Sequence, residues 1–326
     1  ATERLRRTIN DAMDVHAGKA VIDGPKNYLS STYRAIPIAI TVEGANIMTR
    51  SLMIYGQGSI RCHPFLQKEI EAANNPDRTE AVRQFDGLLG RHAAYVFKLL
   101  GLAVGRAWTA GCLAASPVDG PPARHFRQLK RLSAALALVS EAAIVTLGGA
   151  LKRKEMISAR LGDALSELYI VSAMLKQFED ADRPSDELAL LDYACQSSLS
   201  AAEEALKGVI VNFPGRPVGW LLRLAVQPFG IVCRPPRDDL ARTVSDIISE
   251  PGAARDRLTA GIYVGGETEL GRLDRAFRLM AELEPVRQKM RQARLRSAEE
   301  AAAAGILTGN EAGRMEEALA LVREVL

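Results

Sequence analysis

Apolar residues recur every three to four positions along most of the chain, which is the spacing of one face of an α-helix. The segment 2–15 shows this spacing first, with Leu5, Ile9 and Met13 on a common face. Longer amphipathic segments follow residue 64, and turns rich in proline, glycine, aspartate and asparagine separate them. They cover 65–73, 79–115, 123–152, 155–180, 185–211, 218–226, 237–249 and, with breaks, 270–326. No segment alternates β-branched and polar residues for long enough to predict a strand.

The pattern therefore predicts an all-α fold, in which long helices joined by short turns pack as an antiparallel bundle. A short helix is expected over 28–36 and should end before Pro37, because proline disfavours helical geometry in the residue that precedes it. A further helix should start at Asn46 as its cap and run to about Tyr55. The glycines of Gly56-Gln57-Gly58 are expected to end it.

Composition narrows the class of protein. Of the 326 residues, 48% are apolar and 25% are charged, as in an ordinary globular protein. The net charge of +3 is too small to indicate a nucleic-acid partner, and aromatic residues, at 5%, are too sparse for a surface that stacks bases. The four cysteines form no CxxC pair and the four histidines no metal motif. We therefore expect no metal site, no disulfides and a reducing, cytoplasmic environment.

One acid, Glu43, stands in an otherwise apolar run from Ala35 to Ile47. Desolvation raises the pKa of a carboxylate in such surroundings, which suits a general base that removes a weakly acidic proton from carbon. Gly44, which follows it, permits a sharp turn and a close approach to the backbone. The alternative is an acid at the amino terminus of a helix, where the helix dipole favours negative charge.

The run from Val42 to Met48 resembles the Tyr-Glu-Gly-Thr-x-x-Ile signature of acyl-CoA dehydrogenases. Upstream, Asp14-Val15-His16-Ala17-Gly18 is similar to the family's Gln-x-x-Gly-Gly element, and Arg34 matches the Arg of its Arg-Asp-Ala-x-x segment. The chain departs from these patterns where Asp14 stands for Gln, Ala17 for the first Gly and Ala45 for Thr. The stretches 24–27, 35–37, 56–64 and 157–163 resemble the long bacterial fatty-acid β-oxidation branch of the FadE type.

The resemblance implies that residues 1–65 are the carboxy-terminal part of the dehydrogenase helical domain, and that 66–326 form an all-α extension domain. The chain would be a carboxy-terminal piece of a longer enzyme and inactive alone. FAD would be the cofactor, a medium- or long-chain acyl-CoA the substrate, and an electron-transfer flavoprotein the electron acceptor. The enzyme would be at least a homodimer.

Residue roles follow from the same resemblance. Glu43 would be the catalytic base, and Gly44 and Arg34 would contact substrate. The flavin would be contacted by Asp14, His16, Ala17, Gly18, Ala45, Asn46 and Ile47. The alternatives are a helix-ending Gly18, a surface Arg34 and a non-catalytic all-α binding or scaffold module.

The span 205–237 carries basic residues without an acid, beside an apolar helix that contains Trp220. Such a helix suits a membrane interface, and residues 216–237 are a candidate for peripheral contact with the inner membrane. The alternative is a short helix buried against the bundle.

Overall fold

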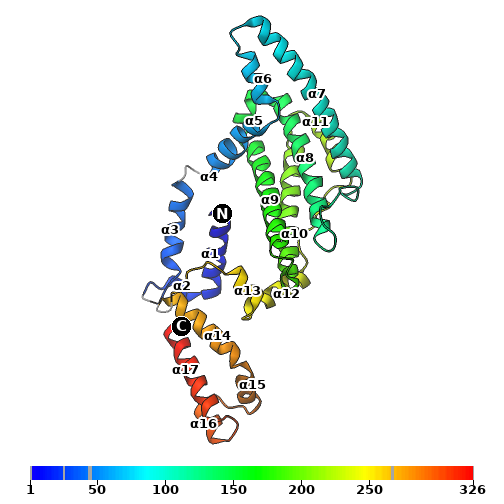
Figure 1. Cartoon of the computed structure of the whole chain (residues 1–326). Coiled ribbons are helices and arrows are strands. Elements are labelled where there is room, and N and C mark those ends of the chain that lie inside the picture. Colours follow the sequence, from blue (N-terminus) through cyan, green and yellow to red (C-terminus); the bar gives the residue numbers. More distant parts are fainter. Residues whose placement is uncertain (1, 25, 43–45, 266–267, 326) are drawn as a thin grey trace. The chain divides into compact units, whose positions relative to one another are not determined.

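The structure, a computed structural model, describes residues 2–24, 26–42, 46–265 and 268–325, and it is built from helices (Figure 1). No strand occurs in these ranges, so the predicted all-α fold is confirmed. The chain divides into two compact units. Unit 1 comprises Ala1–Val42 and Ser245–Leu326, and unit 2 comprises Glu43–Val244. The predicted division between residues 65 and 66 separates the part that resembles the dehydrogenase helical domain from the extension. The compact units are defined by contacts and do not test that division, so it stays a prediction.

Unit 2 is a bundle of long helices, most of which begin and end within a few residues of the predicted bounds. Its elements are α4 (Asn46–Met48), η1 (Thr49–Gln57), α5 (Gly58–Cys62), α6 (Leu66–Ala73), α7 (Arg78–Trp108), α8 (Ala123–Leu147), η2 (Gly148–Arg153), α9 (Glu155–Asp180), η3 (Ser185–Glu187), α10 (Leu188–Val211) and α11 (Arg216–Val226). Helix α12 (Asp238–Ser249) crosses the boundary between the units. The carboxylate of Asp77 caps α7 by accepting hydrogen bonds from the backbone N–H groups of Thr79 and Glu80, at 3.0 and 3.2 Å.

The core of unit 2 lies among α8, α9 and α10, which run side by side (Figure 1). On α9 the inward residues Leu161, Leu168 and Leu175 recur at helical spacing and are buried. Within the described residues, the stretch Ala123–Arg153 alone is long and apolar enough to cross a membrane. In the bundle its residues Leu132 and Val139 pack into the core, which accounts for its apolar character.

A buried ion pair ties the segment after α11 to this bundle. Arg131 of α8 and Glu203 of α10 are 1% and 0% exposed, and Arg131 Nη1 donates to Glu203 Oε1 over 2.7 Å. The second carboxylate oxygen of Glu203 accepts the backbone N–H groups of Val232 and Cys233, at 3.1 and 2.6 Å. Gln128 accepts from Arg131 Nε at 2.7 Å. The charges are therefore paired and hydrogen-bonded, as buried charges must be.

Two predicted helix ends are wrong. Helix α3 (Ser30–Thr41) does not end before Pro37 but continues through it. Proline removes a single N–H donor, and the solvent-exposed face of this helix lets water satisfy the freed carbonyl. Residues Gly56-Gln57-Gly58 do not end a helix either, because the chain runs on through the π-helix η1 into α5.

Close packing explains the continuous helix at Gly56. Helix α9 lies against η1 so tightly that a Cβ atom on Gly162 would stand 2.9 Å from the Arg50 carbonyl oxygen. This tertiary contact holds the helix in place and outweighs the poor helix propensity of glycine.

Unit 1 combines two groups of helices. The first is α1 (Thr2–His16), α2 (Gly18–Val21) and α3, which bury Ile9, Ala20 and Ile36. The second is α13 (Ala253–Leu258), α14 (Glu269–Glu282), α15 (Glu284–Gln292), α16 (Ala298–Ala303) and α17 (Gly309–Val325). A separate small core, which includes Leu283, Met290 and Met315, joins α14 to α17. Helix α13 is joined to α14 by ion pairs of Arg255 with Asp274 and of Asp256 with Arg278.

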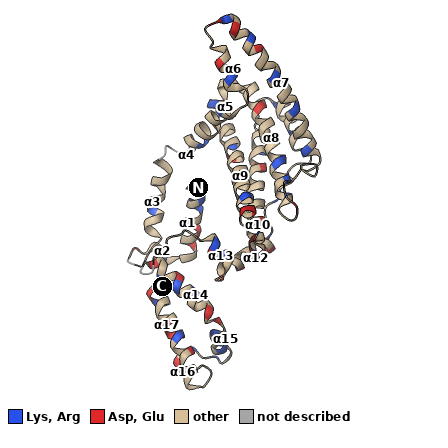
Figure 2. Ribbon diagram, in the orientation of Figure 1, with Lys and Arg blue, Asp and Glu red and all other residues tan. Residues whose placement is uncertain are grey.

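Each unit carries both basic and acidic residues on its helices (Figure 2). This distribution agrees with the small net charge of +3. The four cysteines are free thiols.

Candidate functional site

The predicted base and its two followers, Glu43, Gly44 and Ala45, lie outside the described residues. Asn46 is half-buried and is the first residue of α4. The backbone of Ile47 continues this helix, but the side chain of Ile47 is not described. The apolar run before Glu43 is exposed for most of its length, with Ile38 and Val42 at 61% and 69%. Helix α3 therefore presents apolar surface, at Ile38 and elsewhere, that a further surface could cover.

The predicted flavin-contacting turn, Asp14–Gly18, joins α1 to α2 at the surface. Asp14, Ala17 and Gly18 are exposed, and a Cβ atom on Gly18 would meet nothing within 4 Å. Ala17 adopts φ 49° and ψ −129°, a conformation that favours glycine. This is the position where the family pattern has Gly, and the conformation here is one that Gly adopts without strain. The open turn lets another molecule approach closely.

His16 is used inside unit 1. Its Nδ1 atom donates to the carbonyl oxygen of Ala12 at 2.8 Å, so in the neutral ring Nε2 accepts from the Tyr28 hydroxyl. Burial raises the pKa of Tyr28, which keeps that hydroxyl protonated. His16 therefore fastens the loop after α2 to α1, and its neighbours Ala17 and Gly18 are left as the accessible part of the turn.

Arg34 forms a surface ion pair with Asp23, at 2.9 Å, and both side chains are exposed. Hydrogen bonds from Ser30 and Arg34 lower the pKa of Asp23. The pair orients the loop that leads into α3. Contact between Arg34 and substrate stays a prediction.

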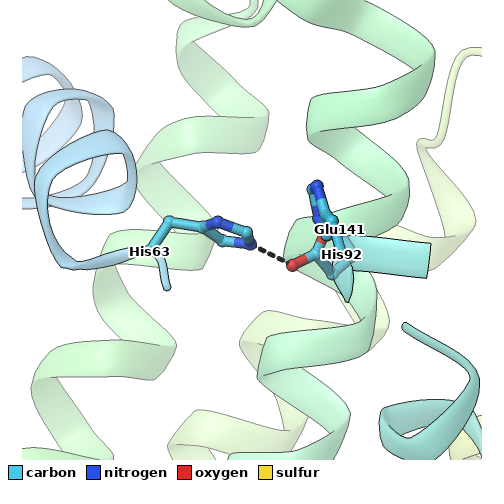
Figure 3. Close-up of side chains that lie close together, drawn as sticks. All are labelled: His63, His92 and Glu141. Atoms are coloured by element: carbon cyan, nitrogen blue, oxygen red, sulfur yellow. Dashed lines mark hydrogen bonds and ion pairs between the residues drawn. The ribbon is translucent and has the colours of Figure 1, made fainter. Parts of the chain in front are cut away.

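The structure brings together a set of residues that the sequence analysis did not combine. His63 follows α5, His92 lies on α7 and Glu141 on α8 (Figure 3). Glu69, on α6, joins the same set. His63 Nε2 is hydrogen-bonded to Glu141 Oε1, and His92 Nε2 lies 3.3 Å from Glu141 Oε2. On its other side, His92 Nδ1 lies 2.9 Å from Glu69 Oε1. The four side chains form one buried network that joins three helices and a turn.

Aromatic rings enclose this network. The ring of Phe65 stacks on that of His92, with centroids 5.2 Å apart, and Tyr95 lies beside both His63 and Phe65. Burial, together with the charge of Glu141, raises the pKa of Tyr95, and the same causes raise that of Tyr55 to about 12. Both phenols therefore remain neutral near the carboxylate.

The ligand atoms of His63, His92 and Glu141 lie within 4.8 Å of one another, which is close enough to surround a metal ion. The hydrogen bonds of His63 argue against that use. Its Nδ1 accepts the backbone N–H groups of Phe65 and Leu66, at 3.1 and 3.0 Å, so Nε2 must carry the ring hydrogen. A protonated Nε2 donates to Glu141 and has no lone pair for a metal. The sequence-based expectation of no metal site stays a prediction, and the tautomer of His63 favours it.

The sequence does contain a signal for this network. Glu141 is the one acid in the apolar stretch from Ser133 to Leu151, and a buried carboxylate needs a donor. What the sequence does not give is which of the four histidines supplies that donor, because the partners come from separate helices.

Comparison with known proteins agrees with the resemblance seen in the sequence. A family model described as "Acyl-CoA dehydrogenase, C-terminal, bacterial type" matches residues 60–326. No solved structure matches the chain. The network of His63, Glu69, His92 and Glu141 lies inside the matched region, whereas Glu43 lies before it.

Proposed function

Because the chain belongs to the family of bacterial-type acyl-CoA dehydrogenase carboxy-terminal domains, we propose that it works within a flavin-dependent enzyme that desaturates acyl-CoA. The substrate would be a medium- or long-chain acyl-CoA, and the product a trans-2-enoyl-CoA of fatty-acid β-oxidation. The match over residues 60–326 is the observation that carries this proposal, and the Glu-Gly motif just before it supplies the chemistry.

In this proposal Glu43 removes the α-proton of the acyl thioester. That proton is weakly acidic, so the base must be positioned within reach of the α-carbon and shielded from water. Bound FAD would supply the acceptor for the hydride that leaves the β-carbon. The exposed apolar residues Ile38 and Val42 support this arrangement, because they offer a surface for the parts of the enzyme that would cover Glu43.

The cofactor would be contacted by two segments of the chain. The open turn at Ala17 and Gly18 fits the close approach of a flat ring system, and Asp14 lies exposed beside it. Ala45, Asn46 and Ile47 would form the second segment, after the base. A homodimer, in which the turn reaches the flavin of the neighbouring subunit, and electron transfer to a flavoprotein belong to the same proposal.

Replacing Glu43 by Gln in the intact enzyme tests the proposed base. We expect kcat for acyl-CoA desaturation to fall by about 10²–10⁴-fold, the usual contribution of a general base, while flavin absorbance is retained. Glu316→Gln, which changes an exposed acid of α17 in the same way, should leave kcat unchanged. Full activity of the Glu43→Gln enzyme would favour the alternative of a non-catalytic helical scaffold.

A second function, peripheral membrane contact, is supported by the surface of α11. Trp220, Leu221 and Leu224 are exposed on this helix, while Gly219, Leu222 and Val226 face the bundle. Trp108 and Phe229 extend the exposed apolar surface, with ring centroids 6.1 Å apart. The basic residues beside it, Arg216, Arg223, Arg234 and Arg237, are exposed. An apolar patch with arginines beside it suits an anionic lipid surface.

A further inference from the structure

An apolar cavity of about 240 Å³ lies in unit 2, where η1, α5 and α6 meet the end of α8 and η2. Its walls include Ile60, Leu66, Ile144 and Leu151. A cavity of about 150 Å³ lined by such residues holds a molecule of benzene. The cavity is therefore large enough for a short aliphatic chain but not for a drug-sized ligand.

One hydroxyl group in the wall of this cavity has no hydrogen-bond partner. Ser51 is 3% exposed, and its Oγ is buried without a partner among the described residues. A buried polar group without a partner is energetically unfavourable. The other serines in the wall are already bonded, since Ser59 donates to the Gly56 carbonyl and Ser158 to that of Lys154. Ser51 is thus the lining hydroxyl that remains for a ligand.

The backbone that carries Ser51 is unusual. Residues Thr49–Gln57 form a π-helix, a conformation that is rare and occurs often at functional sites. Both Ser51 and Gly56 of this π-helix line the cavity. The π-helix packs against η2, the 3₁₀ segment that also contributes residues to the lining of the cavity.

The charge in the lining of the cavity is positive. Lys152 is the one charged residue in its lining, and Arg153 and Lys154 follow it in the chain. All three side chains are exposed, and no acid lines the cavity. A ligand with an anionic group near Lys152 would be attracted, and one with a cationic group would be repelled.

We propose that this cavity binds a short linear aliphatic chain that ends in a carboxylate. The aliphatic part lies among Ile60, Leu66 and Ile144, where it leaves water. The carboxylate accepts a hydrogen bond from the Ser51 hydroxyl and pairs with the Lys152 ammonium group. The site does not depend on Glu43, so it stands or falls separately from the proposed dehydrogenase reaction.

Calorimetric titration of the chain with octanoate tests the proposal. We expect saturable binding, weaker binding of octanol, which lacks the charge, and none of octylamine, whose charge is reversed. Ile144→Phe fills the cavity and should weaken octanoate binding by about tenfold or more, the effect of roughly 1.4 kcal/mol. Val145→Phe makes the same change at the next residue of α8, which is exposed, and should leave binding unchanged.

Two smaller changes test the polar contacts. Ser51→Ala removes the hydroxyl without adding bulk, and Lys152→Gln removes a charge at the surface. Each should weaken octanoate binding by about two- to fivefold, as expected for a single hydrogen bond or an exposed ion pair, and should leave octanol binding unchanged. Nuclear Overhauser contacts from octanoate to the methyl groups of Ile60 and Ile144 would place the ligand directly, even if a variant folds poorly. Failure of octanoate to saturate the chain, or contacts only to other methyl groups, would overturn the proposal.

Discussion

At the scale of single residues, Ala17 is the clearest case in which backbone and side chain disagree. Its φ of 49° and ψ of −129° match those of Gly148, at 49° and −130°, where the chain does use glycine. Such a conformation costs a residue with a Cβ atom about 1–3 kcal/mol. From the sequence, Ala17 was seen only as a departure from the family's Gly, and the structure shows that the backbone at this position has a conformation that favours glycine.

Ala17→Gly should therefore stabilise the chain. We expect the free energy of unfolding to rise by about 1 kcal/mol, because relief of strain exceeds the entropy that glycine gains in the unfolded state. Ala12→Gly, within α1, should instead lower it by about 0.5–1 kcal/mol. Urea titration followed by circular dichroism measures both. Equal destabilisation by the two changes would show that Ala17 is not strained.

At the scale of elements, the buried pair of Arg131 and Glu203 connects α8, α10 and the segment that follows α11. Arg131→Met would leave the carboxylate of Glu203 buried without its partner, which typically costs about 3–5 kcal/mol. Adding Glu203→Gln removes that charge and keeps an oxygen to accept the Cys233 N–H. The double variant should therefore recover at least half of the loss in urea unfolding. A double variant less stable than Arg131→Met would contradict this account.

Cys233 has a passive role in the same region. Burial, together with the charge of Glu203, raises the pKa of its thiol to about 12. The thiol stays neutral at physiological pH, and it packs against Arg131 as part of the core rather than as a nucleophile.

The long helices were predictable because each buries one apolar face, and that face is visible in the sequence as apolar residues that recur every three to four positions. The predicted segment 155–180 coincides with α9 (Glu155–Asp180). The helix ends expected at Pro37 and at Gly56–Gly58 were wrong because other effects outweighed local helix propensity. At Pro37 water can satisfy the freed carbonyl, and at Gly56–Gly58 packing against α9 holds the helix. The network of His63, His92 and Glu141 was missed because its members are far apart in the sequence, and pairing of separate helices cannot be deduced from one-dimensional spacing.

At the scale of the whole molecule, the family match covers parts of both compact units. Residues 60–244 of the match belong to unit 2, and 245–326 belong to unit 1 together with the first 42 residues. Within unit 1, the Lys26 ammonium group donates to the carbonyl oxygen of Arg323 at 2.8 Å, so segments near the two ends of the chain are in contact. The loop between α2 and α3, which carries Lys26, is thus in contact with the carboxy-terminal region of the family domain.

From the exposed apolar face of α11 we predict that the whole molecule binds to anionic membranes. The chain should float with vesicles that contain anionic lipid and less with neutral vesicles. Trp220→Ser with Leu221→Ser should reduce the bound fraction about tenfold or more, because burying each such side chain contributes roughly 1.5–3 kcal/mol. Phe97→Ser, which changes an exposed apolar residue on α7, serves as the control. Equal loss in the control, or no flotation at all, would remove the membrane function.

The account rests most heavily on Glu43 as the group that takes the α-proton. The most direct measurement is exchange of that proton, in which the intact, flavin-loaded enzyme is incubated with acyl-CoA in D₂O and deuterium at the α-carbon is followed by mass spectrometry. We predict exchange with the parent enzyme, and exchange at least about 10²-fold slower with Glu43→Gln, whose flavin content is unchanged. Exchange at the parent rate in the Glu43→Gln enzyme would contradict the proposed role of this residue.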